Sequence, residues 1–443
     1  MLRVLTNRTY AALFAAQVVA LIGTGLLTVA LGLLAYELAG ARAGAVLGTA
    51  LTIKMVAYVG LAPLVQALAS QVPRKALLIG ADLVRASVAM ALPFVAEVWQ
   101  IYVLIFVLQA ASASFTPAFQ SAIPDILPDE DDYTRALSLS RLAYDLENLL
   151  SPVLAGLLLA VMSFHWLFLG TVAGFLGSAA LVFRTAVPKA GAGRARPFLE
   201  RLTQGVRIYL ATPRLRGLLA LSFATAAAGA FVIVNTVVMV RASYGGGETA
   251  VAWALAAFGG GSMAAALALP RLLARLADRR VMIAAALVLA AVTLGHGLWV
   301  ALAGLAPWGG FLALWAASGA AYAAILTPSG RLLRRSALAE DRPALFAAQF
   351  ALSHACWLLT YPLAGWAGLA LGLGPALALL GALAGAGVLA ALWLWPGDDA
   401  EERVHDHADL PPGHPHLLAH GGLRHHAHPF VIDDEHRHWP RAG

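Results

Sequence analysis

Histidines are concentrated at the C-terminal end of the chain. Residues 396–443 hold ten of its thirteen histidines, with nine carboxylates among them. Neutral imidazole suits Ni²⁺, Zn²⁺, Cu²⁺ and Fe²⁺, and carboxylate adds hard oxygen donors. Spacings such as His-Asp-His and His-His-Ala-His let a flexible chain close several chelates, at a cost in conformational entropy. We predict a disordered, cytoplasmic, metal-binding tail with the ligands His405, His407, His414, His416, His420, His425, His426, His428, His436 and His438.

The role of this tail is left open by its composition. A polar disordered segment without a metal role is the alternative, whereas an appended tag is disfavoured because the histidines are interspersed. If the tail binds metal, we favour buffering or delivery of the ion over a role that transport requires.

A second group of polar residues lies within an apolar run at 136–162. A carboxylate at the centre of a bilayer costs at least about 2.5–3.5 kcal/mol, so Asp145 and Glu147 in one span need partners or a function. Asp145 and Asn148 share a helical face, and Arg141, one turn earlier, has the spacing to neutralise Asp145. Metal binding, proton binding and structural pairing are the interpretations of these residues.

Glu147 has no partner at helical spacing and points away from Asp145. Its candidate partners are Lys54 and Arg85, which lie in neighbouring apolar runs, although Arg85 also has the spacing to pair with Asp82. Lys54 is therefore expected either to pair with Glu147 or to act in ion coupling.

The apolar run at 343–369 also contains polar side chains. Gln349 and Cys356 fall on one helical stripe, while His354 aligns with two aromatic residues. A histidine in a span is either a core residue or a ligand, and a buried thiol is more often an inert packing group. We place these three on the substrate and proton pathway, together with Gln17 and Asn235 from other runs.

The elements that position these residues follow from composition. The chain has 443 residues, of which 60% are hydrophobic and only 12% charged, with mean hydropathy +0.76. Soluble proteins carry about 25% charged residues. This composition excludes a soluble enzyme, a nucleic-acid-binding protein and a disordered protein. The single cysteine excludes an intrachain disulfide, and we find no phosphate-binding loop, zinc-hydrolase motif or activated nucleophile, so we do not expect an enzyme.

Twelve long apolar runs account for most of the length. A membrane-spanning helix needs about 20 apolar residues, and the alternating segments of about 10 residues that β-barrels show do not occur. The first run is too long for a signal peptide. We predict an all-α membrane protein with twelve transmembrane helices near 10–38, 44–69, 76–96, 99–122, 136–162, 165–187, 215–241, 248–269, 281–304, 308–329, 343–369 and 374–395.

The basic residues predict the orientation. With both termini in the cytoplasm, 25 of the 30 lysines and arginines fall in cytoplasmic segments and only Arg42 and Arg241 fall outside. This distribution satisfies the positive-inside rule. The net charge of +6 therefore reports topology and not a nucleic-acid partner, and we expect a multi-pass protein of a bacterial inner membrane.

The chain also shows a weak internal repeat. Thr116-Pro117 recurs as Thr327-Pro328, and the sequence SPVLAG at 151–156 recurs loosely as YPLAG at 361–365. Repeated halves are typical of secondary transporters, which bind substrate near the midplane. We divide the chain into an N-terminal six-helix half, a cytoplasmic linker, a C-terminal six-helix half and the tail, at 1–190, 191–213, 214–395 and 396–443.

These features resemble a major facilitator superfamily transporter over about residues 1–395. The stretch SFTPAFQSAIPDILPDEDDYTRALSLS (114–140) resembles the pattern of the branch that includes enterobactin exporters. The superfamily's loop motif is degraded in the first half, as QALASQVPRK (66–75), but the second half keeps LADRR (276–280). The resemblance implies a gating loop at Asp278, Arg279 and Arg280.

A narrower resemblance is to the NreB-type nickel-resistance exporters. It rests on RLAYDLENLLSPVLAG (141–156), SHACWLLTYPLAGW (353–366) and the histidine-rich tail. That family implies proton-driven efflux of Ni²⁺, or of Co²⁺ or Fe²⁺, from the cytoplasm, with the ion as substrate and no permanently bound cofactor.

We therefore expect a monomer that exports metal by rocking its two halves about a midplane site. Metal and proton compete for the same lone pairs, so exchange of one for the other follows from the site chemistry. An exporter of a siderophore or drug, which needs a large aromatic cavity, and a membrane metal sensor are the alternatives.

Overall fold

The computed structural model describes residues 2–39, 43–68, 72–188, 197–397, 402–407, 411, 413–419, 423–436 and 438–440. Within them, a short 3-10 helix (Leu2–Thr6) precedes the six long helices of the first half. These are α1 (Arg8–Ala39), α2 (Ala43–Leu68), α3 (Arg74–Ala91), α4 (Val98–Ile126), α5 (Glu130–Leu159) and α6 (His165–Phe183).

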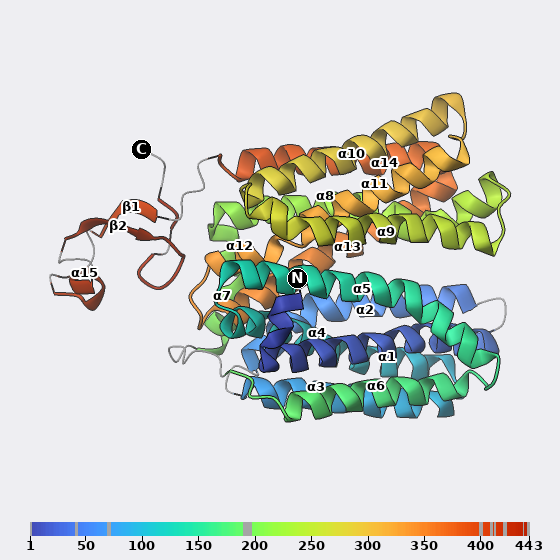
Figure 1. Cartoon of the computed structure of the whole chain (residues 1–443), viewed down its shortest axis with the longest axis horizontal. Coiled ribbons are helices and arrows are strands. Elements are labelled where there is room, and N and C mark those ends of the chain that lie inside the picture. Colours follow the sequence, from blue (N-terminus) through green and yellow to red (C-terminus); the bar gives the residue numbers. More distant parts are fainter. Residues whose placement is uncertain are drawn as a thin grey trace.

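The second half contains another six long helices and one short one. A π-helical turn (Met239–Ser243) extends the first of them. They are α8 (Pro213–Val238), α9 (Glu248–Leu273), α10 (Asp278–Ala303), α11 (Trp308–Leu326), the short α12 (Ser329–Arg335), α13 (Arg342–Leu371) and α14 (Leu373–Leu394). Figure 1 shows the two halves as parallel bundles lying side by side.

The helical pattern confirms the predicted all-α membrane fold. Eleven of the described helical segments are long and apolar enough to cross a membrane. The remaining predicted span is α5, which is 30 residues long but begins with an acidic turn and carries Arg141, Asp145 and Glu147. The predicted span at 308–329 differs in detail, because the chain breaks at Thr327-Pro328 and α12 follows as a separate helix.

The predicted linker region contains a helix, α7 (Phe198–Ala211), which packs against α13. Their backbones meet at Gly205, where a Cβ would lie 2.1 Å from the carbonyl oxygen of Ala344. Only glycine permits this approach. We call the end of the bundles that carries α7, α12 and the tail the tail side (Figure 1).

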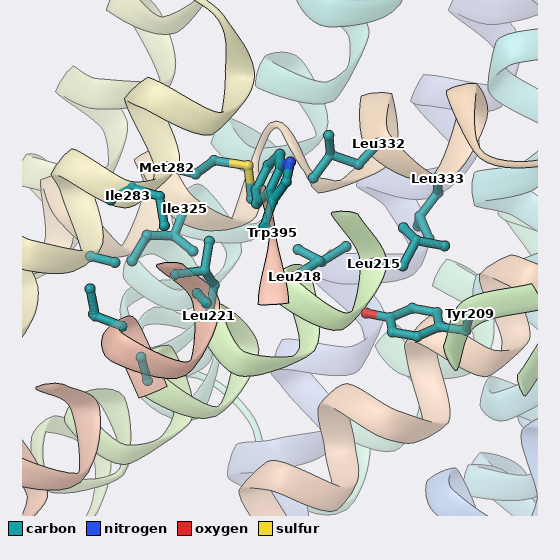
Figure 2. Packing of buried hydrophobic residues seen from close by; sticks show 14 of the residues in the cluster. Tyr209, Leu215, Leu218, Leu221, Met282, Ile283, Ile325, Leu332, Leu333 and Trp395 are labelled. Carbon is teal, nitrogen blue, oxygen red and sulfur yellow. The ribbon is translucent and has the colours of Figure 1, made fainter. Parts of the chain in front are cut away.

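A buried cluster on the tail side holds the last span and the start of the tail in place. Trp395, which follows α14, is fully buried, and Figure 2 shows its ring between Met282 and Leu332. Trp395 also packs closely on α8. A Cβ added at Gly217 of α8 would lie only 2.5 Å from the Cβ of Trp395. Because Trp395 is buried among three helices, the tail leaves the bundle at a fixed point.

The described part of the tail is folded, where composition alone indicates disorder. Strands β1 (Glu402–Asp406) and β2 (His425–Pro429) pair antiparallel, with His405 opposite His426, and a short helix, α15 (Pro415–Ala419), lies between them in sequence. The physical reason is a small apolar core, because Leu417, Phe430 and Ile432 are at most 3% exposed.

Candidate functional site

Ion pairs join the tail-side ends of the two halves. Asp125, near the end of α4, accepts hydrogen bonds from Arg74 at 2.9 Å and from Arg342 at 2.8 Å. Arg74 begins α3 in the same half, whereas Arg342 begins α13 in the other half. One carboxylate therefore links both halves.

Arg331 of α12 makes a second link between the halves. Its guanidinium lies 2.6 Å from Glu130 of α5 and 2.9 Å from Asp278 of α10. It also donates to the Thr134 hydroxyl at 2.6 Å, and Arg335 lies 3.3 Å from Asp278. We call Asp125, Glu130, Asp278, Arg331 and Arg342 the tail-side gate.

The three predicted gating residues have different surroundings. Asp278 is 3% exposed and belongs to the gate. Arg279 donates instead to the carbonyl of Trp395 at 3.0 Å, and the side chain of Arg280 is exposed. Sequence reasoning did not identify Asp125, Glu130, Arg331 or Arg342, because the pairs that join the halves are about 200 residues apart and no local spacing signals them.

Asp145 is held by partners from both halves. Arg141 reaches it at 2.6 Å, and the Ser262 hydroxyl of α9 donates to it at 2.6 Å. Arg141 also donates to Ser262 at 3.0 Å and lies over the Tyr322 ring, 4.9 Å from its centroid. Asp145 is 3% exposed, so its charge is compensated where it is buried.

Glu147 and His354 come from opposite halves and share a neighbour. Lys54 interacts electrostatically with both. The His354 Nδ1 donates to the Phe350 carbonyl at 2.7 Å, and its ring contacts the edge of Tyr58 at a centroid distance of 4.7 Å. The Nδ1 proton leaves the lone pair on Nε2, which is the form that binds a metal ion. Lys54, Glu147 and His354 form the group that we call the intramembrane triad.

The other predicted pathway residues hold helices together. The buried Gln17 accepts a hydrogen bond from Ser140 at 3.1 Å, and the buried Asn235 donates to the carbonyl of Ala364 at 3.0 Å. Gln349 accepts one from the Tyr209 hydroxyl of α7.

Cys356 and Asn148 are the other two residues that the sequence places on the pathway. The Cys356 thiol is buried and donates to the carbonyl of Leu352 at 3.4 Å, one turn earlier in its own helix. The side chain of Asn148 lies outside the described residues. Arg85 pairs with Asp82, which also accepts a hydrogen bond from Ser178 at 2.7 Å, so Arg85 is occupied within its own half.

Six tail histidines converge in space. Five ring nitrogens, one from each of five residues, all lie within 4.8 Å of one another. Nε2 of His436, a sixth residue, lies 3.1 Å from that of His405 and 3.3 Å from that of His407. We call these residues the histidine cluster: His405, His407, His416, His426, His428 and His436.

The remaining tail histidines lie outside this cluster. His414 lines an adjoining cavity of about 410 Å³, together with Asp433 and Glu435. His425 and His438 are exposed, and His420 lies outside the described residues.

The cluster rings are oriented by their second nitrogens. Nδ1 of His405 donates to the carbonyl of Arg403 at 2.9 Å, that of His426 to Leu423 at 2.7 Å and that of His428 to Pro429 at 2.8 Å. Nδ1 of His436 lies 2.8 Å from the Asp433 carboxylate. Metal-binding histidines in proteins are held in this way by carbonyl and carboxylate partners.

Two pKa shifts describe the electrostatics of the cluster. Burial, together with the neighbouring imidazoles His428, His436 and His407, lowers the pKa of His405 to about 4, so this ring is neutral at pH 7. Burial opposes the ionisation of Asp433, but hydrogen bonds from His436 and from backbone N–H groups outweigh it and lower the pKa of this carboxyl. The cluster therefore combines a neutral donor with a charged carboxylate behind it.

The tail contacts the second half. Phe430 and Ile432 belong to the buried cluster that contains Leu332 and Leu333 of α12. Asp434 lies 3.8 Å from Arg207 of α7. The Arg214 guanidinium lies 5.2 Å from the ring centroid of Trp439. These contacts hold the tail against the tail side of the second half.

Comparison with known proteins defines the class. The Major Facilitator Superfamily profile matches residues 13–245, more than half of the chain. The chain therefore belongs to the Major Facilitator Superfamily and is a multi-pass membrane transporter. It is 30% identical over 123 residues to the uncharacterized transporter YfiS of Bacillus subtilis, covering 28% of this chain and 29% of that one.

The chain is also similar to an efflux protein in sequence and to solved transporter structures in fold. The chain is 27% identical over 184 residues to macrolide efflux protein A of Streptococcus pyogenes, covering 40% of this chain and 45% of that one. The matched regions thus span less than half the length of these two relatives. The fold resembles a bacterial homologue of the iron transporter ferroportin in an outward-facing state, with TM-score 0.69, 15% identity and coverage of 87% and 98%. It also resembles a human organic anion transporter, with TM-score 0.68, 12% identity and coverage of 87% and 99%.

Proposed function

We propose that this transporter exports a divalent transition-metal ion from the cytoplasm in exchange for protons. Ni²⁺ is the first candidate, as in the NreB-type exporters, followed by Co²⁺ and Fe²⁺. The observation that carries the proposal is the histidine cluster, which gathers six imidazoles on the side that bears the gate. A protein that moves organic molecules has no evident use for such a cluster.

The orientation follows from the basic residues. If the tail side is cytoplasmic, as the positive-inside rule predicts, the gate closes the cytoplasmic entrance and the structure is outward-facing. Both termini then lie in the cytoplasm of a bacterial cell, with the chain in the inner membrane. In this orientation the histidine cluster meets metal before the gate opens.

The intramembrane triad supplies the exchange chemistry in this proposal. Glu147 and His354 offer an oxygen and a nitrogen donor from opposite halves, and Lys54 provides a positive charge that acts on both. Protonation removes the lone pairs that a metal needs. Binding on the cytoplasmic side and proton-driven release on the other side follow from alternating access.

The test uses vesicles that contain the purified protein and an imposed proton gradient. We expect gradient-driven Ni²⁺ flux in the wild type and a loss of at least about tenfold in Glu147→Gln, which equals about 1.4 kcal/mol. Glu37→Gln, at an exposed position near the end of α1, is the matched control and should transport normally. Full flux in Glu147→Gln would exclude the triad, and no metal flux in the wild type would exclude metal export.

An exporter of an organic compound is the second candidate. Aromatic rings also lie among these helices: Tyr58 contacts His354, and the ring centroid of Trp357 lies 6.4 Å from that of Tyr322 and 4.9 Å from that of Tyr361. The similarity to macrolide efflux protein A also favours this candidate. Cells that lack the gene and become sensitive to a drug, but to no metal, would support it. A membrane metal sensor without transport would show metal binding and no flux in vesicles.

A further inference from the structure

The histidine cluster contains a contact that neutral rings do not explain. Nδ1 of His405 carries a proton, because it donates to a carbonyl, and Nδ1 of His436 faces the Asp433 carboxylate. In neutral rings of this tautomer, Nε2 of each residue is a lone-pair acceptor. These two acceptors nevertheless lie 3.1 Å apart. A cation between them removes the repulsion.

The other distances match the edges of a coordination polyhedron. Nε2 of His416 lies 3.0 Å from that of His407 and 3.2 Å from that of His426. With metal–nitrogen bonds of about 2.1 Å, neighbouring ligands are about 3.0 Å apart in an octahedron and about 3.4 Å apart in a tetrahedron. The observed spacings, from 3.0 to 3.3 Å, fall between these two values and therefore fit ligation of one ion in either geometry.

The number of donors distinguishes the geometries more strongly. A tetrahedral zinc site takes four ligands, whereas five ring nitrogens here lie within 4.8 Å of one another and His436 adds a sixth. In an octahedron of this bond length the longest ligand separation is about 4.2 Å, somewhat below the 4.8 Å within which the five nitrogens lie. The six rings come from β1, α15, β2 and the segment after β2, so the site forms only when these segments are folded together.

We propose that the histidine cluster is a resident six-coordinate site for one divalent ion that accepts octahedral nitrogen ligation, such as Ni²⁺ or Co²⁺, and that filling it fixes the tail against α12. Phe430 connects the cluster to the buried core that includes residues of α12. Phe430 lies between the two cluster histidines His428 and His436 in sequence, its ring is 4.8 Å from that of His436, and it shares a buried cluster with Leu332 and Leu333.

This site is separate from the transport path. Its ligands are on the tail, whereas the triad lies within the helices, so metal binding to the cluster does not require transport. The inference shares the histidine cluster with the proposed function, but the two are tested separately: binding to the cluster is measured without transport, and failure of Ni²⁺ flux leaves it intact.

The test uses the full chain, purified without a histidine tag and stripped of metal by a chelator. Titration with Co²⁺ should show one tight ion with the weak visible absorption of octahedral cobalt, and Ni²⁺ should displace it. His407→Ala/His436→Ala should lower Co²⁺ affinity at least about tenfold. The matched control, His425→Ala/His438→Ala, removes two exposed histidines outside the cluster and should bind normally.

The fixing of the tail against the helices is measured separately. The readout is cleavage by trypsin after the tail arginines Arg403 and Arg424. Ni²⁺ should slow this cleavage at least about tenfold in the wild type and in the control variant, but not in the cluster variant. An intensely coloured tetrahedral cobalt complex, equal weakening by both double variants, or metal-independent cleavage would overturn the proposal. A tail that binds only protons would show no cobalt spectrum, and this outcome would overturn it as well.

Discussion

The intramembrane triad and the histidine cluster both offer metal ligands, but they differ in the number of ligands and in the groups that surround them. The triad has one carboxylate, one imidazole and a lysine, with Asp145 nearby already paired to Arg141. The cluster has six imidazoles, several oriented by carbonyl groups, and a carboxylate behind one of them. A carrier must release its ion during each cycle, so a sparse site with a competing cation suits transport. A dense, preformed site suits retention.

The largest expected effect is on folding, and it tests whether Asp145 acts with the triad in ion binding or only stabilises the helix packing. Arg141→Ala leaves the buried Asp145 carboxylate without its ion-pair partner, which costs about 3–5 kcal/mol. We expect loss of folded, monodisperse protein in detergent. Arg141→Ala/Asp145→Asn should recover most of it, because no charge then remains. If Arg141→Ala folds normally, Asp145 has other compensation and becomes a candidate metal ligand again.

The next effect separates the two regions by function. A chain that ends at Pro396 lacks the histidine cluster but keeps Trp395 and the triad. We expect it to lose the tight ion while restoring metal tolerance to cells that lack the gene, at least in part. The measurement is growth across a series of Ni²⁺ concentrations, with expression checked. A truncated chain that folds but gives no tolerance would mean that the cluster belongs to the transport path.

A smaller effect concerns the gate, which lies between the two regions. Arg331→Ala removes the ion pairs with Glu130 and Asp278, and the pair with Glu130, whose side chain is 49% exposed, is worth at most about 1 kcal/mol. We expect the gate to open several times more often. A cysteine placed on the tail side of α5, in a Cys356→Ser background, should then be labelled faster. Arg275→Ala, an exposed neighbour on the same side, should leave the rate unchanged.

The smallest effect concerns a residue that the sequence places on the pathway. Tyr209→Phe removes the hydroxyl that donates to Gln349. If Gln349 serves only to hold α7 on α13, the loss should be about 1 kcal/mol of stability, seen as a modest fall in Tm with unchanged flux. A fall in flux at unchanged Tm would instead indicate that Gln349 belongs to the substrate pathway.

Much of the fold could be predicted, because each spanning helix depends mainly on its own apolar residues. Local pairs such as Arg141 with Asp145 and Asp82 with Arg85 also follow from helical spacing alone. The gate could not be predicted, since Asp125 and Arg342 meet only after twelve helices have assembled. The strand pairing in the tail does not follow from the sequence for another reason: Phe430 and Ile432 are too few to signal a core, and they are buried in a cluster built mostly from residues of the second half.

The buried Trp395 has a consequence for local concentration. His405 follows this anchor by ten residues, so an extended chain keeps it within about 36 Å of the bundle. One ion confined to a sphere of that radius corresponds to a concentration on the order of 10 mM. Tethering of this kind raises the chance of a second encounter without any new contact. While it is bound to the cluster, an ion is therefore held near the transporter at a concentration that dilute metal in the surrounding solution does not reach.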